Sequence, residues 1–257
     1  MTQRRPGFPA RLDASPNAAS PRPANGVPRV MAPAAPQGLG LDSAAVRARM
    51  VQRLVSSGIQ AGAVLSAMGA VERHRFVDSA LVNQAYEDTS LPIGLGQTIS
   101  KPSVVARMVE LLMGAEIARG GRGLGRVLEI GTGCGYQACV LARVAREVYT
   151  VERLRALHEK ARDNLRPLRL ANVHLLLGDG MLGYAKGAPY AAIISAAGGE
   201  ILPQHWCDQL AVGGRLVAPT VGTNGRQVLL VIDKTPHGLQ QSVLEAVHFV
   251  PLKSGIA

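Results

Sequence analysis

Three glycines, Gly131, Gly133 and Gly135, follow directly on an apolar segment at residues 126–130 that we expect to form a buried strand. Glycine accepts positive φ angles and lets a ligand approach the backbone closely. The helix expected from Tyr136 onwards would direct its positive end at that ligand. The spacing therefore predicts a turn that binds a nucleotide.

The same spacing indicates which nucleotide the turn would bind. A dinucleotide fingerprint, G-x-G-x-x-G, would need a glycine at position 136, where Tyr136 stands. The chain instead reads E-x-G-x-G-x-G, which resembles the first motif of the S-adenosylmethionine-dependent methyltransferases. This resemblance implies S-adenosylmethionine as the cofactor, and it implies cofactor-binding roles for Glu129, Gly131, Thr132, Gly133 and Gly135.

Two further acids each end an expected strand. Glu152 lies 21 residues after the first glycine, where a ribose-binding acid belongs, and Arg153 follows it. Asp179 and Gly180 follow another apolar run, so the Asp179 carboxylate could accept a hydrogen bond from an adenine amino group. Either acid alone could equally be an ordinary strand-end residue in a polar turn. Because three acids fall at strand ends, we predict that Glu152, Arg153, Asp179 and Gly180 complete the cofactor site.

The composition indicates one folded domain behind a different leading segment. Of the 257 residues, 47% are hydrophobic, which is enough for a sizeable core. Residues 1–40 hold eight of the sixteen prolines and five arginines with a single acid, so we expect a disordered tail. We assign residues 41–257 to a methyltransferase domain, with a helical cap and substrate loop at 41–113 and a cofactor-binding sheet at 126–257. The chain contains no apolar run of signal-peptide or membrane-span length, so we expect a cytoplasmic protein.

Charge and residue usage limit the expected partners. The net charge of +10 favours anionic substrates. Nucleic acid is not expected, because the chain has no basic stripe interleaved with aromatic residues. The three cysteines form no C-x-x-C pair and the six histidines show no metal-ligand spacing, so we expect reduced thiols and no metal. No heptad pattern or uncapped apolar helix demands a partner, so we expect a monomer.

Strands and helices alternate along most of the chain. Strands are expected at 126–130, 147–151, 173–177, 191–195, 214–218, 228–232 and 246–250, and helices near 136–146, 153–166 and 203–210. This alternation predicts an α/β fold, with a Rossmann-like, doubly wound, mostly parallel seven-stranded sheet whose last strands are antiparallel. Apolar spacing also predicts an N-terminal helical cap, with two helices between Leu41 and Val71 and a third from Pro102.

A long segment at residues 85–102 suits neither a helix nor a regular strand, and loops of this length are usually functional. With later motifs, it resembles the protein-L-isoaspartate O-methyltransferase family from about residue 50 to residue 252. The matching blocks are Tyr86-Glu87-Asp88, Leu91-Pro92-Ile93-Gly94, Gly96-Gln97-Thr98-Ile99-Ser100, Val127-Leu128-Glu129-Ile130-Gly131-Thr132-Gly133 and Gly178-Asp179-Gly180.

The resemblance implies an enzyme that methylates the α-carboxylate of L-isoaspartyl residues in damaged proteins and peptides. It implies that Ser100 is the catalytic serine and that Thr98, Ile99 and Ser100 bind the substrate. A carboxylate is ionised at neutral pH, so the transfer needs alignment and water exclusion rather than a strong base. The Ser100 hydroxyl could orient this carboxylate, helped by free N–H groups in the helical turn that starts at Pro102. The simpler alternative is that Ser100 only caps that helix.

The chain departs from the family pattern after the fourth strand. Ala191 stands where family members commonly carry an acid, and Ala196 stands where they carry a threonine. Because this loop should border the site, one alternative is a family-like protein that binds S-adenosylmethionine but has an altered acceptor or no activity. Amide or adenine methylation would need an Asn/Asp-Pro-Pro motif, whereas the chain has Ser195-Ala196-Ala197-Gly198 there.

Overall fold

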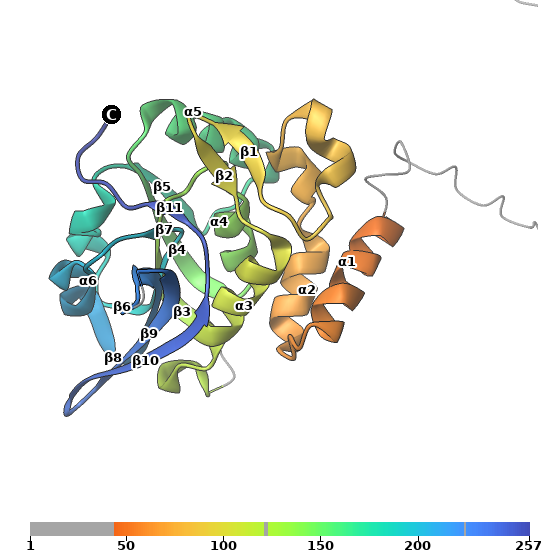
Figure 1. Ribbon diagram of the computed structural model, residues 1–257. Coiled ribbons are helices and arrows are strands. Elements are labelled where there is room, and N and C mark those ends of the chain that lie inside the picture. Colours follow the sequence, from red (N-terminus) through yellow and green to blue (C-terminus); the bar gives the residue numbers. More distant parts are fainter. Residues whose placement is uncertain (1–43, 121–122, 224) are drawn as a thin grey trace, which may run out of the picture. The chain divides into compact units, whose positions relative to one another are not determined.

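The computed structural model describes residues 44–120, 123–223 and 225–257, all of which belong to one compact unit. The boundary predicted at residue 40 lies outside these residues. The centre of the unit is a seven-stranded sheet in the order β10-β9-β8-β6-β3-β4-β5 (Figure 1). Its strands are β3 (Leu124–Ile130), β4 (Ala145–Glu152), β5 (Val173–Leu177), β6 (Tyr190–Ser195), β8 (Leu210–Val221), β9 (Gln227–Thr235) and β10 (Gly238–Ala246).

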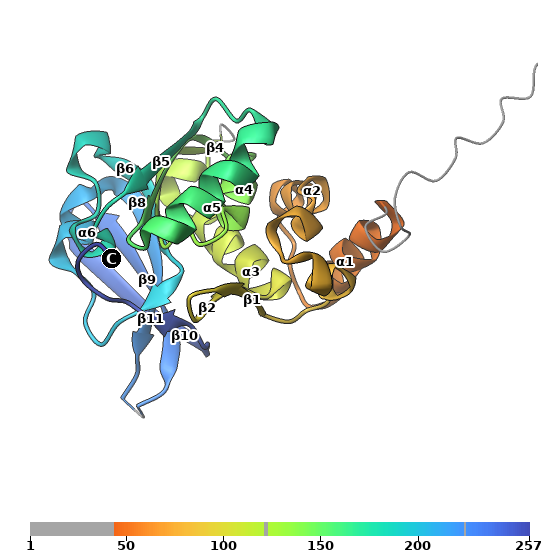
Figure 2. The ribbon, with the colours of Figure 1, turned by 90° about the horizontal axis from the view of Figure 1, so that it is seen from above.

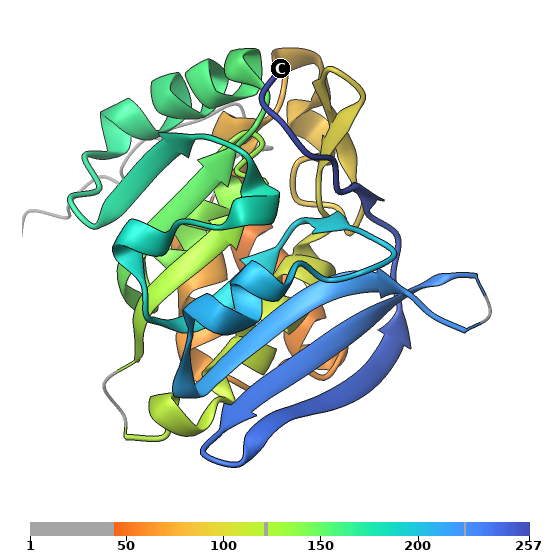
Figure 3. The same ribbon diagram turned by 90° about the vertical axis from the view of Figure 1, so that its left-hand side faces the viewer.

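Five neighbouring strands of this sheet are parallel to one another, and the last two pairings, β8/β9 and β9/β10, are antiparallel. The pairs β5/β4, β4/β3, β3/β6 and β6/β8 are parallel, whereas β9 and β10 form an antiparallel hairpin at one edge (Figure 3). Every residue of the central strand β6 is buried. A strand covered on both faces needs an uninterrupted apolar run, as residues 190–194 provide. These observations confirm the predicted α/β architecture.

Helices cover both faces of the sheet, and the alternation of side chains along each strand divides the core in two. Val127 of β3 and Ile194 of β6 belong to one buried cluster, together with side chains from the first five helices. Their neighbours Leu128 and Ile193 point to the opposite face and belong to a second cluster, which contains Trp206. Three of these helices follow strands β3, β4 and β7, namely α4 (Tyr136–Leu141), α5 (Arg155–Leu165) and α6 (Gln204–Gln209). Figure 2 shows helices α1 to α5 on one side of the sheet and α6 on the other.

The predicted helical cap consists of α1 (Ala44–Ser56), α2 (Gly62–Ala70) and α3 (Pro102–Met113). Helix α1 ends just before Gly58, whose φ of 101° few other residues accept. One carboxylate oxygen of Glu110 in α3 accepts the backbone N–H groups of Gln60 and Ala61 at 2.7 and 2.9 Å. This contact anchors the start of α2 to α3. In the described part of the chain, no helix combines the length and apolar character needed to cross a bilayer.

The segment at residues 85–102 is more regular than predicted. It contains an antiparallel hairpin of β1 (Leu91–Gly94) and β2 (Gln97–Ile99), in which Leu91 pairs with Ile99. The expectation that no regular strand forms there is therefore wrong. Ile93 is buried between exposed neighbours, so the alternation that marks a strand is present. This alternation covers only four residues, two of which are proline and glycine, so the sequence does not reveal the strand.

Other bounds also differ from the prediction, and β8 (Leu210–Val221) extends beyond the predicted residues 214–218 at both ends. Helix α4 ends at Leu141 rather than near residue 146, because β4 begins early, at Ala145, which pairs with Leu124 of β3. The last strand of the sheet is β10 at residues 238–246 rather than 246–250. Most of β10 is exposed, and its apolar residues do not alternate regularly with its polar ones, so it lacks the pattern of a half-buried strand. The apolar residues that follow it instead lead to a short parallel pair, β7 (Ala197–Gly198) and β11 (Val250–Pro251).

Arg215 links the antiparallel edge of the sheet to the cap. Arg215 in β8 makes two hydrogen bonds of 2.7 and 2.8 Å to the Asp233 carboxylate in β9, and a third of 2.9 Å to the carbonyl oxygen of Leu111 in α3. We expect D233N to lower the free energy of unfolding by about 1–3 kcal/mol, because it weakens a charge-assisted pair that is mostly buried.

Urea denaturation would measure this loss. The matched control is D163N, since Asp163 pairs with Arg162 at 3.9 Å and both side chains are largely exposed. Equal unfolding midpoints for D233N and D163N would contradict the expected role of the buried pair.

Candidate active site

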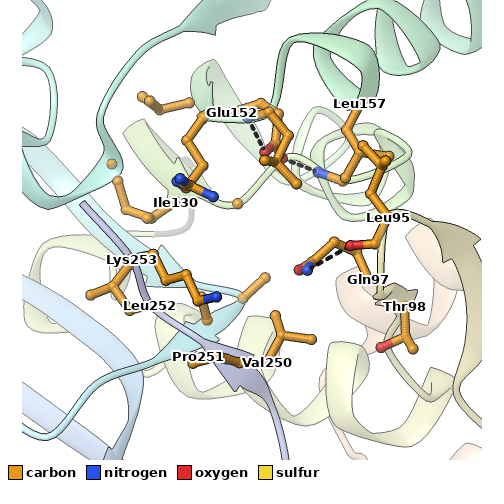
Figure 4. A pocket seen from close by; sticks show the side chains of 18 of the residues that line it. Leu95, Gln97, Thr98, Ile130, Glu152, Leu157, Val250, Pro251, Leu252 and Lys253 are labelled. Atoms are coloured by element: carbon orange, nitrogen blue, oxygen red, sulfur yellow. Dashed lines mark hydrogen bonds between the residues drawn. The ribbon is translucent and has the colours of Figure 1, made fainter. Parts of the chain in front are cut away.

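The candidate site is a cavity of about 280 Å³ beyond the carboxyl ends of β3 and β4 (Figure 4). This volume is near the lower end of the range for small-molecule sites. We call it the main cavity. Its walls come from the β1–β2 hairpin, the glycine turn, the end of β4 and the last residues of the sequence; they include Ile93, Leu95, Gln97, Thr98, Ile130, Gly131, Gly133, Glu152, Arg153, Leu157, Gly180, Ala196, Ala197, Val250, Pro251, Leu252 and Lys253.

The glycine turn (residues 131–135) has the conformation that its sequence predicts. Gly131 and Gly133 line the main cavity with φ angles of 89° and 58°. A Cβ atom on Gly133 would lie 3.1 Å from the Ile93 side chain of the hairpin, so a larger residue would crowd this wall. Gly135 does not line the cavity but is the N-cap of α4, with a φ of 90°. The Thr132 side chain points away from the main cavity and shares a 2.6 Å hydrogen bond with Thr150.

Glu152 lies at the edge of the main cavity and connects the turn to β4. One carboxylate oxygen accepts the N–H of Gly133 at 2.8 Å, and the other accepts the N–H of Leu154 at 2.9 Å (Figure 4). Each carboxylate oxygen has a further lone pair, so Glu152 can still accept hydrogen bonds from the hydroxyl groups of a sugar. The next residue, Arg153, also lines the cavity.

Asp179 lies behind the main cavity rather than in its wall. Its Oδ1 accepts the N–H of Met181 at 2.9 Å, and its Oδ2 accepts the N–H of Gly255 at 2.7 Å. Its neighbour Gly180 does line the cavity, and the Gly180 carbonyl accepts the indole N–H of Trp206 at 2.8 Å. The structure therefore places Asp179 next to the predicted cofactor site, with both oxygens already accepting backbone N–H groups.

Residues 252–257, which we call the strap, cross the rim of the main cavity. The Leu252 N–H donates to the carbonyl of Gly198 at 2.7 Å, which continues the β7/β11 pairing. Further along, the Arg153 side chain donates to the carbonyl of Gly255 at 2.9 Å, and the Ala257 N–H donates to the Arg153 carbonyl at 2.9 Å. Sequence reasoning assigned no site role to these residues. Their contacts run mainly through the backbone, which leaves little signal in the side chains.

Glu129 is completely buried beneath the glycine turn and does not line the main cavity. Neither of its carboxyl oxygens has a hydrogen-bond partner among the described residues. Burial raises the pKa of Glu129 to about 8, although the nearby Thr150 and Gln137 side chains act in the opposite direction. Glu129 is therefore mostly protonated at neutral pH when the cofactor is not bound.

Ser100 lines a second, smaller cavity of about 30 Å³, roughly the size of one water molecule. This small cavity adjoins the main cavity at the glycine turn. It shares four lining residues with the main cavity, Thr98, Gly131, Gly133 and Ala196. Its other lining residues include the two further predicted substrate residues, Ile99 and Ser100. The rest are Val105, Thr132, Cys134, Tyr136 and Gln137.

The structure does not place Ser100 at the N-cap of α3, which was the alternative role for this residue. The N-cap of α3 is Lys101, and the capping bonds come from Asp88, whose two carboxylate oxygens accept the N–H and the hydroxyl of Ser103 at 2.8 and 2.7 Å. Among the described residues, no hydrogen bond involves the Ser100 hydroxyl. The expectation that the first-turn N–H groups are free for an anion is wrong for Ser103. The Ser100 hydroxyl itself remains available to a ligand.

A seven-stranded, mostly parallel sheet, a glycine turn after one strand and an acid at the end of the next define a class I S-adenosylmethionine-dependent methyltransferase. The cavity next to Gly131, Gly133 and Glu152 fits such a cofactor, because its floor carries no side chains at the glycines and its rim offers carboxylate acceptors.

Residues 45–257 match the family model described as protein-L-isoaspartate (D-aspartate) O-methyltransferase. The chain belongs to this family. It is 62% identical over 222 residues to a protein-L-isoaspartate O-methyltransferase of Methylibium petroleiphilum, covering 86% of this chain and 81% of the relative. It is 59% identical to the enzyme of the same name from Leptothrix cholodnii, covering 91% and 83% of the two chains. A solved structure named protein-L-isoaspartate O-methyltransferase superposes with a TM-score of 0.72 at 29% identity, over 82% of this chain and 67% of the other.

The buried carboxyl group of Glu129 generates a prediction about pH. Its pKa in the folded chain, about 8, is above its ordinary value of 4.5, so the folded state holds this proton more tightly than the unfolded state. The contribution of Glu129 to stability is therefore present at low pH and is lost as the pH rises towards 8. We expect E129Q, which cannot ionise, to gain stability relative to the parent protein between pH 5 and pH 8, on the order of a few kcal/mol.

Urea unfolding of both proteins at several pH values measures this difference. The control is E159Q, which changes an exposed glutamate of α5. A difference between E129Q and the parent that stays constant from pH 5 to pH 8 would show that Glu129 titrates like an ordinary glutamate.

The strap generates a second prediction. Deleting residues 253–257 removes Lys253 from the wall of the main cavity and removes the N–H that Asp179 accepts from Gly255. We expect the affinity for S-adenosylmethionine to fall by about tenfold or more, since a preorganised wall is lost. Calorimetry measures the affinity, and I256A serves as control because it changes an exposed side chain and keeps every backbone contact. Equal affinities for the deletion and I256A would refute the role of the strap.

Proposed function

We propose that this methyltransferase acts on the α-carboxylate of L-isoaspartyl residues in damaged proteins and peptides. The observation that carries the proposal is the pair of adjoining cavities. The main cavity is lined by Glu152 and by glycines suited to a cofactor, and the adjoining small cavity is lined by Ser100, whose hydroxyl has no hydrogen-bond partner among the described residues.

The proposed cofactor residues fall into two groups. Gly131, Gly133, Glu152, Arg153 and Gly180 would contact S-adenosylmethionine directly, since all five line the main cavity. When bound, this cofactor supplies an electrophilic methyl group. The second group would act from behind the wall: Thr132, Gly135 and Asp179 would hold the shape of the turn and of the loop after β5, and Glu129 would act from its buried position beneath the turn.

The proposed acceptor residues are Thr98, Ile99 and Ser100 on β2 and its extension. Ser100 would donate its hydroxyl hydrogen to one oxygen of the isoaspartyl carboxylate and orient the other oxygen towards the main cavity. Buried apolar groups around it, including Ile99 and Val105, would keep water away from the reacting atoms. A carboxylate is already ionised at neutral pH, so alignment and dryness are sufficient.

A family-like protein with an altered acceptor or no activity is the alternative function. The observation that favours it is that Ala196, one of the departures from the family pattern, lines both cavities. A threonine there would add a hydroxyl to the wall between cofactor and acceptor. The other departure, Ala191, is buried within β6 and lines neither cavity.

We further propose that the protein works as a cytoplasmic monomer with no nucleic-acid partner. The supporting features are all in the sequence, which has no basic stripe interleaved with aromatic residues, no heptad pattern and no apolar run of signal-peptide or membrane-span length. Sedimentation with and without RNA would test the oligomeric state and the absence of a nucleic-acid partner.

Methyl transfer from labelled S-adenosylmethionine to an isoaspartyl peptide, compared with its normal aspartyl twin, tests the proposed activity. We expect methylation of the isoaspartyl peptide alone. Equal labelling of both peptides would refute the substrate assignment, and binding of the cofactor without any labelling would favour the inactive alternative.

A variant of Ser100 tests its role. We expect S100A to lower kcat by about tenfold to a thousandfold, because one positioned donor to the acceptor is lost. Its affinity for S-adenosylmethionine should stay within about twofold, because the hydroxyl faces the small cavity and not the main one. The control is S242A on the exposed strand β10. A large loss of cofactor affinity in S100A would instead assign this hydroxyl to the cofactor site.

A further inference from the structure

Arg73 is a completely buried arginine in the 3₁₀ turn η1 (Arg73–Phe76) of the cap. Its Nε donates a hydrogen bond of 2.7 Å to the carbonyl oxygen of Ala85, and its Nη2 donates a longer one of 3.5 Å to the carbonyl oxygen of Thr89. Its Cζ lies 4.7 Å from the centre of the Tyr136 ring. A single guanidinium group therefore contacts two segments that are far apart in the sequence.

This cation is buried without a carboxylate partner. Across residues 44–120, 123–223 and 225–257, Arg73 forms no ion pair, and its Nη1 has no hydrogen-bond partner. Burial lowers the pKa of Arg73, which reflects the cost of keeping a charge away from water. Two carbonyl dipoles and the face of an aromatic ring offset only part of that cost. For stability alone, an apolar side chain of similar length would serve as well.

The two contacted segments are the ones that must meet for methyl transfer. Ala85 and Thr89 begin the stretch of chain that runs through the β1–β2 hairpin to Ser100, which we call the acceptor segment (residues 85–100). Tyr136 is the first residue of α4, directly after the glycine turn, and it lines the small cavity together with Ser100.

Neighbouring contacts support the same connection. Phe76, three residues after Arg73, meets the Tyr136 ring edge-on, with ring centres 5.6 Å apart. His74 Nδ1 lies 2.7 Å from the hydroxyl of Tyr86 in the acceptor segment. The turn η1 thus contacts the acceptor segment on one side and α4 on the other, and Arg73 is the residue that contacts both.

We propose that Arg73 is a positioning residue for methyl transfer, which holds the acceptor segment in register with the glycine turn so that the Ser100 hydroxyl faces the bound cofactor. This inference rests on the proposed function of Ser100. Arg73 touches neither reactant and acts only through the carbonyl groups of Ala85 and Thr89 and the ring of Tyr136. A displacement of about 1 Å at a reacting group is enough to lower a rate by a factor of about a hundred.

The experiment compares R73M, R73K and the control R75M in the full chain. Arg75 lies two residues away, is exposed and pairs with Glu72 at 3.4 Å. We expect R73M to keep or raise its melting temperature, since the buried charge is gone. Its affinity for S-adenosylmethionine should stay within about twofold, while kcat for the isoaspartyl peptide falls by at least about tenfold. R73K keeps the charge and one donor, so its kcat should lie between those of R73M and the parent.

Hydrogen exchange provides a second readout that does not depend on activity. We expect faster amide exchange in residues 85–100 of R73M than in the parent, with unchanged exchange in α1 and in R75M. A folded R73M with parental kcat, or with parental exchange in the acceptor segment, would overturn the proposal. If R73M does not fold, a parental kcat and parental exchange in R73K would overturn it equally.

The two proposals fail in different ways. If the parent protein does not methylate the isoaspartyl peptide, the proposed function is wrong. If the parent protein is active but kcat and cofactor affinity fall by the same factor in R73M, Arg73 supports the cofactor site instead and its proposed positioning role is wrong.

Discussion

The glycine turn depends on the end of the neighbouring strand for its shape. Gly131 donates its N–H to the carbonyl of Val151 at 2.9 Å, and Gly133 donates its N–H to the Glu152 carboxylate at 2.8 Å. Because β3 and β4 are parallel, their carboxyl ends meet at one edge of the sheet, and both bonds form there. Glu152 is thus both a strand-end residue that organises a turn and a candidate ligand for a sugar. The two interpretations weighed from the sequence are compatible.

The predicted elements agree best with the structure where burial decides the sequence pattern. The interior strand β6 appears within one residue of its predicted bounds, because a parallel strand covered on both faces must be apolar along its length. The apolar pattern does not predict an element whose residues are mostly exposed, or one whose end is set by a contact distant in the sequence. The exposed strand β10 is held by backbone pairing with β9, and no composition rule marks it. Helix α4 is shortened by pairing at Ala145, a contact distant in sequence that local propensity does not contain.

The candidate site shows the same division. The glycines and Glu152 could be placed from spacing alone, since their geometry follows from a strand, a turn and a helix in sequence. Asp179 was expected to contact the cofactor but does not line the main cavity, and its Oδ2 accepts the N–H of Gly255. Arg73 lay outside any motif. Its contacts are to two carbonyl oxygens and a ring, and nothing in the neighbouring residues predicts which carbonyls a buried guanidinium will reach.

The strap has a consequence for the biogenesis of the protein. Val250 and Lys253 complete a wall that also contains Gly133, more than a hundred residues earlier in the chain. At a synthesis rate of about 5–20 residues per second, the residues of the opposite wall are therefore made on the order of ten seconds after the glycine turn. A nascent chain halted before residue 250 would contain every glycine and acid of the motif and still lack a closed binding chamber. The chain thus becomes competent to bind the cofactor only after residues 250–253 have been synthesised.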